Sequence, residues 1–180
     1  MRSIFLAKRV GSRRPGAEGQ SLVEFALVLT PLFMILLGII QFGFIFNAYI
    51  TITNATREGA REGSIYLYTQ SLSQGANDAA RNTLILTTVK NSMNLLSPTA
   101  PHFTTGTTWT QSGDVFTNGD MTVTYVIPTG ITANDPRKGE TVKVEVRYHQ
   151  DLMIPIISAL LPKDAGGRMI LTGQVTMVIN

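Results

Sequence analysis

A long run of uncharged residues, 25–56, constrains this chain more than any other feature of its sequence. Its first part, residues 25–46, consists almost wholly of Leu, Ile, Phe, Val, Met and Gly. About 20 such residues cross the hydrocarbon core of a bilayer as a helix. A cleaved secretory signal has a shorter apolar stretch of about 7 to 15 residues and a cleavage site of small residues, which residues 46–49 do not provide. The run therefore predicts a single transmembrane helix.

Basic residues are concentrated before this run, within residues 1–19. Five of the 15 Lys and Arg residues lie there, and Glu18 is the one acidic residue among them. After that segment the remaining ten basic and eleven acidic residues nearly balance, although the whole chain has a pI of 9.4. Lys and Arg residues that flank a membrane helix are retained in the cytoplasm. The charge pattern predicts a cytoplasmic leader and an extracytoplasmic domain, and it gives no support to a nucleic-acid partner.

Residues 19–25, Gly-Gln-Ser-Leu-Val-Glu-Phe, lie between the leader and the apolar run. An ionised side chain such as Glu24 costs about 2.5–3.5 kcal/mol at the centre of a membrane helix and less near its end, so a positive partner would stabilise it. Cleavage after Gly19 would supply one, because Gln20 would then carry a free ammonium group and Glu24 would be the fifth residue. Without cleavage, Gly19 is a flexible joint and Glu24 reaches the headgroups by snorkelling.

This arrangement resembles a class III signal peptide, the substrate of prepilin peptidases. More narrowly, Gly-Gln-Ser-Leu-Val-Glu-Phe-Ala-Leu-Val, followed by Pro31 and by Leu-Gly-Ile-Ile-Gln-Phe-Gly at residues 37–43, resembles the TadE-like family. Residues 54–63, Asn-Ala-Thr-Arg-Glu-Gly-Ala-Arg-Glu-Gly, and a final amphipathic β segment fit the same family. The chain departs from the family at Gln41, where many relatives have an acidic residue, and in lacking the cysteines that form a disulfide in some of them.

TadE-like proteins are minor pilins or pseudopilins of the tight-adherence (Flp, type IVc) pilus. The resemblance implies that a prepilin peptidase cuts between Gly19 and Gln20. It further implies that Glu24, with Phe25 beside it, acts in assembly and recognition, the carboxylate pairing with the amine of a neighbouring subunit. The implied partners are other pilin or pseudopilin subunits and an inner-membrane assembly platform, and the implied location is the cytoplasmic membrane or the pilus. The alternative is an uncleaved, signal-anchored envelope protein whose outer domain binds a ligand or acts as a scaffold.

Four segments follow from these patterns. A leader (1–19) and a transmembrane helix (20–46) precede an extracytoplasmic helical region (47–97). A loop and antiparallel β region of the same outer domain (98–180) completes the chain as given.

Small residues line one face of the helical region, where Ala55, Gly59 and Gly63 follow one another four residues apart. Small residues at this spacing let a second helix approach closely. That helix belongs either to another subunit or to the same chain, and the spacing does not decide between them.

A second helix is predicted between the turn-like residues 71–77 and the pair Pro98 and Pro101, which end it. Arg81 and Lys90 lie off its apolar face. Apolar residues recur there at helical spacing, namely Ala79, Leu86, Val89, Met93 and Leu96.

The remainder alternates with period two, which predicts strands with one buried and one wet face at residues 121–127, 142–149 and 169–179. Residues 97–120 are rich in Thr, Ser, Gly and Asn and predict a surface loop or an irregular hairpin, with Trp109 as a local packing anchor. Helices followed by an antiparallel sheet of about three to four strands predict an α+β fold.

A short apolar segment, residues 152–161, interrupts the β region and is too short and proline-broken to span a bilayer. Exposed, it would be a contact for a partner or a membrane surface. The interpretation that we favour from the sequence is a short helix that plugs the open end of the core.

The sequence offers little support for an enzyme, a metal site or a cofactor. It contains no Cys, and its two His residues, His102 and His149, do not have the spacing of zinc ligands. His149 and Asp151 could be imagined as a base and its orienting group, but the alternation places His149 on the polar strand face, where a solvated histidine is expected. We therefore expect a structural protein that needs no cofactor.

Overall fold

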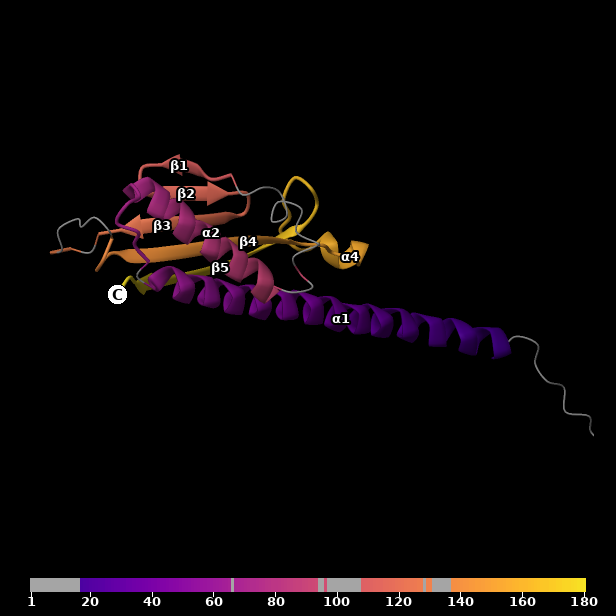
Figure 1. Ribbon diagram of the computed structural model, residues 1–180. Coiled ribbons are helices and arrows are strands. Elements are labelled where there is room, and N and C mark those ends of the chain that lie inside the picture. The colour runs from indigo at the N-terminus through magenta and orange to yellow at the C-terminus, as the bar shows by residue number, and fades with distance from the viewer. Residues whose placement is uncertain (1–16, 66, 94–95, 97–107, 128, 131–136) are drawn as a thin grey trace, which may run out of the picture. The chain divides into compact units, whose positions relative to one another are not determined.

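In a computed structural model we describe residues 17–65, 67–93, 96, 108–127, 129–130 and 137–180. The chain divides into two compact units, with the boundary between Ile39 and Ile40. Helix α1 (Ala17–Ser64) begins in the first unit and ends in the second (Figure 1). Most of the leader, the prolines expected to end the second helix, and His102 lie outside the described residues.

The first unit exposes the apolar part of α1. From Gly19 to Ile39 no described side chain is buried, and the helix continues through Pro31. Such a surface is stable in hydrocarbon, where a helix satisfies all of its own backbone hydrogen bonds. Among the described residues this is the one helix long and apolar enough to cross a membrane, which fits a single-pass membrane protein.

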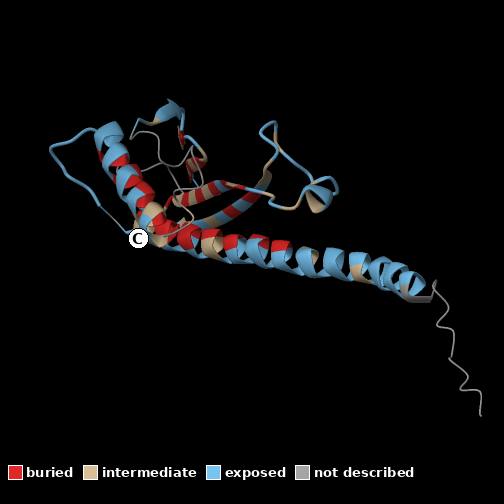
Figure 2. Cartoon of the chain, turned by 90° about the vertical axis from the view of Figure 1, so that its right-hand side faces the viewer, coloured by how far each residue is buried: buried red, intermediate tan, exposed pale blue. Residues whose placement is uncertain are grey.

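The second unit begins where α1 starts to bury side chains against other elements. Figure 2 shows this change along the helix, from exposed positions to a buried stripe. The stripe has the three- and four-residue spacing of one helix face. Its members are Gln41, Ile45, Ala48, Ile52, Ala55, Thr56, Gly59, Ala60 and Gly63.

Helix α2 (Gln74–Met93) confirms the predicted second helix, although its buried face differs from the predicted one. Leu86, Val89 and Met93 are buried as expected, whereas Ala79 is exposed and Arg81 is only 2% exposed. The first half of the helix buries polar residues, because their partners lie across the core and compensate for the loss of water. A purely apolar periodicity could not reveal this face.

The sheet is antiparallel throughout and its order follows the chain, β1-β2-β3-β4-β5. It confirms the α+β prediction but contains five strands, more than the three to four expected, because the segment expected as a loop or hairpin forms the first two. The strands are β1 (Thr110–Ser112), β2 (Val115–Asn118), β3 (Met121–Val126), β4 (Thr141–Gln150) and β5 (Met169–Val178).

The core face of the sheet is made by every second residue of its strands. In β4, alternate residues from Val142 to Tyr148 are buried, and α1 and α2 cover this face (Figures 1 and 2). Helix α1 approaches β5 most closely at Gly173, where an added Cβ would lie 2.7 Å from Thr56 Oγ1 and 3.2 Å from the carbonyl oxygen of Ile52. A side chain at that position would separate the helix from the sheet.

Helix α4 (Pro155–Ser158) corrects the expectation that residues 152–161 plug the core. The helix contains no buried residue, and Leu160 beyond it is 82% exposed. Only the ends of the segment, Leu152 and Leu161, are partly buried against the core. Helix α4 has only four residues and begins with a proline, so it is too short to turn a separate apolar face towards the sheet.

Candidate processing and assembly site

Gly19 and Gln20, the predicted cleavage pair, lie near the beginning of α1 and are exposed. A Cβ added to Gly19 would meet nothing within 4 Å, and its backbone does not have the positive φ that favours glycine. The fold therefore places no demand for glycine at this position.

Glu24 is exposed, and its Oε1 accepts a hydrogen bond from Nε2 of Gln20, one helical turn earlier, at 3.1 Å. Phe25 is 63% exposed. The backbone nitrogen and the side chain of Gln20 belong to the same turn as Glu24, so an ammonium at Gln20 would raise the positive charge near this carboxylate. This geometry suits charge pairing at the start of an apolar helix.

The small-residue face of α1 packs on the chain's own second helix. Ala55 is fully buried, and an added Cβ would lie 2.4 Å from Val89 Cγ2 at Gly59 and 2.6 Å from Ile85 Cδ1 at Gly63. Of the two alternatives that the spacing left open, the described contact is the one with the next helix of the same chain. The face is closed to another helix as long as α2 occupies it.

Gln41 joins α1 to the segment that follows β4. From the sequence, it was noted only as a departure from a family pattern. It is 1% exposed, and its Oε1 accepts a hydrogen bond from the backbone N–H of Met153 at 3.0 Å. Its Nε2 has no hydrogen-bond partner among the described groups. A polar residue four positions before the buried Ile45, inside an otherwise apolar run, was the available signal.

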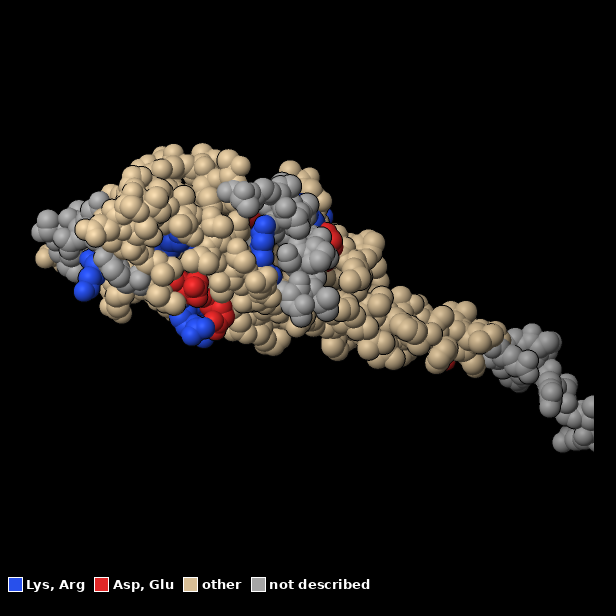
Figure 3. Space-filling view, viewed as in Figure 1, with Lys and Arg blue, Asp and Glu red and all other residues tan. Residues whose placement is uncertain are grey.

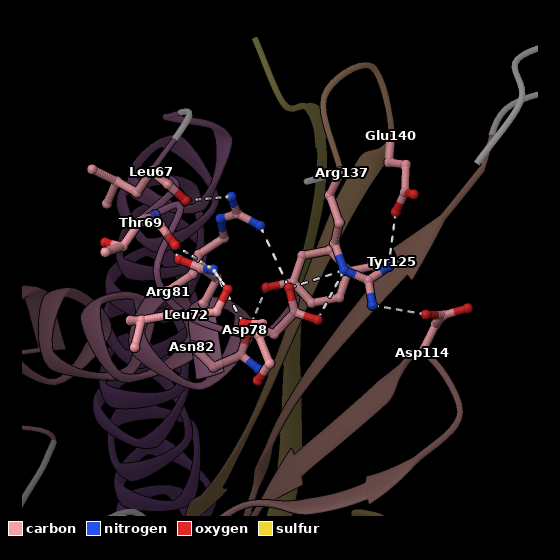
Figure 4. Close-up of polar contacts among 12 residues, drawn as sticks. Leu67, Thr69, Leu72, Asp78, Arg81, Asn82, Asp114, Tyr125, Arg137 and Glu140 are labelled. Atoms are coloured by element: carbon pink, nitrogen blue, oxygen red, sulfur yellow. Dashed lines mark hydrogen bonds and ion pairs between the residues drawn. The ribbon is translucent and has the colours of Figure 1, made fainter. Parts of the chain in front are cut away.

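A buried ionic cluster joins α2 to the sheet and was missed altogether. Arg137 Nε donates to both oxygens of Asp78 at 2.9 and 3.0 Å, Nη1 donates to Glu140 at 2.8 Å, and Nη2 donates to Asp114 at 2.9 Å (Figure 4). The guanidinium lies 4.3 Å from the centre of the Tyr125 ring. Arg137, Asp78 and Glu140 have side chains at most 6% exposed, so the charges compensate one another away from water.

Tyr125 extends this cluster towards α2. Its hydroxyl donates to Oδ1 of Asn82 at 2.7 Å, and its ring meets Phe116 edge to face. Burial raises the pKa of the Tyr125 hydroxyl, against the lowering effect of Arg81. Burial alone would lower the pKa of Arg137, but its hydrogen bonds to Asp78, Glu140 and Asp114 outweigh that effect and raise it.

Arg137 also has an unusual backbone, with φ of 68°, which costs a non-glycine residue about 1–2 kcal/mol. The four hydrogen bonds of its side chain offset this strain. The charged members of the cluster lie three residues apart in two places, Asp78 with Arg81 and Arg137 with Glu140. That spacing was the only sequence signal for them, and it is common on solvated surfaces.

His149 corrects the expectation of a solvated histidine. Its side chain is 13% exposed, with Nδ1 2.5 Å from Asp164 Oδ2 and Nε2 3.1 Å from Asp120 Oδ1. No contact with Asp151, the orienting group imagined from the sequence, is among its described interactions. A hydrogen bond from the backbone N–H of Arg168, followed by the one from His149, lowers the pKa of Asp164. Both carboxylates orient the ring, and the three side chains connect the β2–β3 turn, β4 and the segment before β5.

On the face drawn in Figure 3, charged side chains gather on the second unit (Ile40–Asn180), called the globular unit below. The described surface of α1 in the first unit is almost wholly uncharged. An open apolar hollow of about 520 Å³ is lined by Phe42, Ile45, Phe46, Tyr49 and Leu171.

Among the described residues, no group of three or more His, Cys, Asp or Glu side chains could hold a metal ion.

The comparison with family models gives one match, to the family described as TadE-like protein, over residues 19–61. It confirms the family resemblance predicted from the sequence, and this family is a pilus-associated structural one. No curated protein matches the chain, and no solved structure does either. The matched segment lies entirely within α1, from the predicted cleavage glycine to the helix face that packs on α2.

Proposed function

We propose that this chain is a minor pilin or pseudopilin of a tight-adherence pilus or a related secretion machinery, cut after Gly19 by a prepilin peptidase. The observation that carries the proposal is the TadE-like match over residues 19–61. The matched segment starts at the predicted cleavage glycine and includes the whole exposed apolar part of α1.

The glycine itself supports a processing role. Gly19 has open space around it and no positive φ, so the fold itself does not require a glycine there. Recognition by another protein, such as a peptidase, would account for the glycine. Cleavage leaves Gln20 as the first residue, and its ammonium and those of neighbouring subunits are then available to Glu24. The exposed apolar helix packs among other N-terminal helices, and the globular unit is carried on the outer side of the cytoplasmic membrane.

The test is the N-terminal residue of the full chain purified from membranes, determined by intact mass and peptide sequencing, in cells with and without prepilin peptidase. We expect a start at Gln20 only where the peptidase is present. Gly19→Val should block the cut, and Gly43→Val is its matched control, because an added Cβ meets nothing within 4 Å at either glycine.

A chain that keeps its leader in both kinds of cell would contradict the proposal. It would favour the uncleaved, signal-anchored envelope protein with a ligand-binding or scaffolding domain. Cleavage in cells without the peptidase would contradict it as well, since another protease would then be responsible.

A further inference from the structure

Three large apolar side chains project from the segment between β4 and β5. Met153 is 65% exposed, Ile156 is 56% exposed and Leu160 is 82% exposed. They lie on and around α4, which is beyond the end of the sheet in Figure 1 and contains no fully buried residue. Exposed apolar groups gathered on one short segment are typical of a contact with a partner or a membrane.

A hydrogen bond ties the beginning of this segment to α1 at Gln41. The backbone N–H of Met153 donates to Oε1 of Gln41 at 3.0 Å, and Gln41 is 1% exposed. Both residues belong to the second unit. The position of Gln41 along the apolar run therefore sets the level of Met153 and the residues after it.

That level is inside the expected membrane span. A helix rises about 1.5 Å per residue, so a hydrocarbon core of about 30 Å takes about 20 residues. Counted from the first uncharged residue, Phe25, 20 residues end near Phe44. Gln41 precedes this point, which places the segment tied to it at the boundary between the outer leaflet and its headgroups.

The surroundings have the composition of such a boundary. Lys163, exposed just after the apolar segment, supplies a basic group that suits phosphate headgroups. Tyr49, 49% exposed on α1, is of the type enriched where a membrane meets water.

We infer that residues 153–160 form a second membrane contact, in which Met153, Ile156 and Leu160 enter the outer leaflet beside α1. Lipid is favoured over a second copy of the chain as the occupant, because lipid already surrounds α1 at this height whenever the helix spans the bilayer. The inference depends on the spanning helix and does not depend on cleavage or pilus assembly.

The test uses the full chain in lipid nanodiscs that hold one copy each. The chain contains no Cys, so Leu160→Cys can carry a single environment-sensitive fluorophore. Lipids with a spin label near the headgroup or deep in the acyl chain quench the fluorophore according to its depth. The matched control is Val126→Cys on β3, which is 48% exposed and equally apolar.

We expect quenching at Leu160 to exceed that at Val126 several-fold, and to be stronger with the shallow label than with the deep one. Ile156→Cys should give the same order, so that the result does not depend on one variant. Equal quenching at Leu160 and Val126 would overturn the inference. So would a probe that becomes shielded only in discs with two or more copies, because the occupant would then be the second copy.

Discussion

The two units of this chain treat charge in opposite ways. Before Ile40, α1 buries no described side chain and carries one charged residue after Gly19, the exposed Glu24. The globular unit, in contrast, buries Arg137 together with Asp78 and Glu140. In the globular unit each buried charge is explained by a partner in the same fold. In the helix, the described partner of the exposed carboxylate is a neutral group, the side-chain amide of Gln20.

Removing Arg137 should have the largest effect on the stability of the globular unit. Arg137→Met leaves the buried carboxylate of Glu140 without the Arg137 cation and leaves Asp78 with Arg81 alone, at 3.7 Å, so we expect the free energy of unfolding to fall by about 3–5 kcal/mol. Urea unfolding in detergent, followed by the fluorescence of Trp109, measures this, because Trp109 is the only tryptophan and packs against the core. Arg147→Met is the control: Arg147 is 59% exposed, so its pair with Glu145 is worth about 0–1 kcal/mol.

Two glycines of α1 differ in whether the fold leaves room for a side chain. Gly59→Val forces side-chain atoms into Val89 and should cost about 1–3 kcal/mol of unfolding free energy. Gly43→Val points into open space and should leave the same measurement unchanged. Equal losses for both variants would mean that the helix, and not its packing on α2, limits stability.

A smaller effect is expected at Asp164 in acid. Its pKa is lowered in the folded state, so its carboxylate contributes stability that is complete above its ordinary pKa of about 3.9. That contribution is lost as the pH falls through the lower, folded-state value. Asp164→Asn should therefore be less stable than the parent chain near neutral pH, and the difference should shrink in acid. A difference that persists or grows as the pH falls through the folded-state pKa of Asp164 would refute this assignment.

The smallest effect on unfolding is expected at Glu24. Glu24→Gln keeps the shape of an exposed side chain in the first unit, so the Trp109 transition of the globular unit should not move. Assembly should nevertheless fail, because the charge is lost, whereas the matched change Glu62→Gln on the same helix should be tolerated. Normal pilus assembly with Glu24→Gln would remove the proposed role of the carboxylate.

Elements with one regular period could be predicted from the sequence. The apolar run predicted α1, and alternation predicted β3, β4 and β5, with Val142 to Tyr148 buried in turn. The first two strands are only three and four residues long, which is too short for a periodic signal. Their place in the sheet follows from pairing with β3, which is a property of the folded chain.

The candidate site divides in the same manner. Gly19, Gln20 and Glu24 could be predicted because the residues that give them meaning are adjacent in the sequence. Arg137 and Asp78 are 59 positions apart, and the burial of either depends on the other, so neither shows the apolar periodicity of a core residue. His149 was expected to be solvated for the same reason, since Asp120 and Asp164 reach it from separate segments.

The close approach of Gly173 to Ile52 and Thr56 has a consequence for biosynthesis. The ribosome makes α1 before every other described element, and β5 after them. The side of the buried stripe that faces β5 therefore stays uncovered until the chain has been translated through β5. During that interval the exposed apolar stripe is open to chaperones and to non-native contacts, which compete with folding. The apolar stripe of α1 is therefore covered only when β5 pairs with the sheet, after the apolar part of α1 has been made.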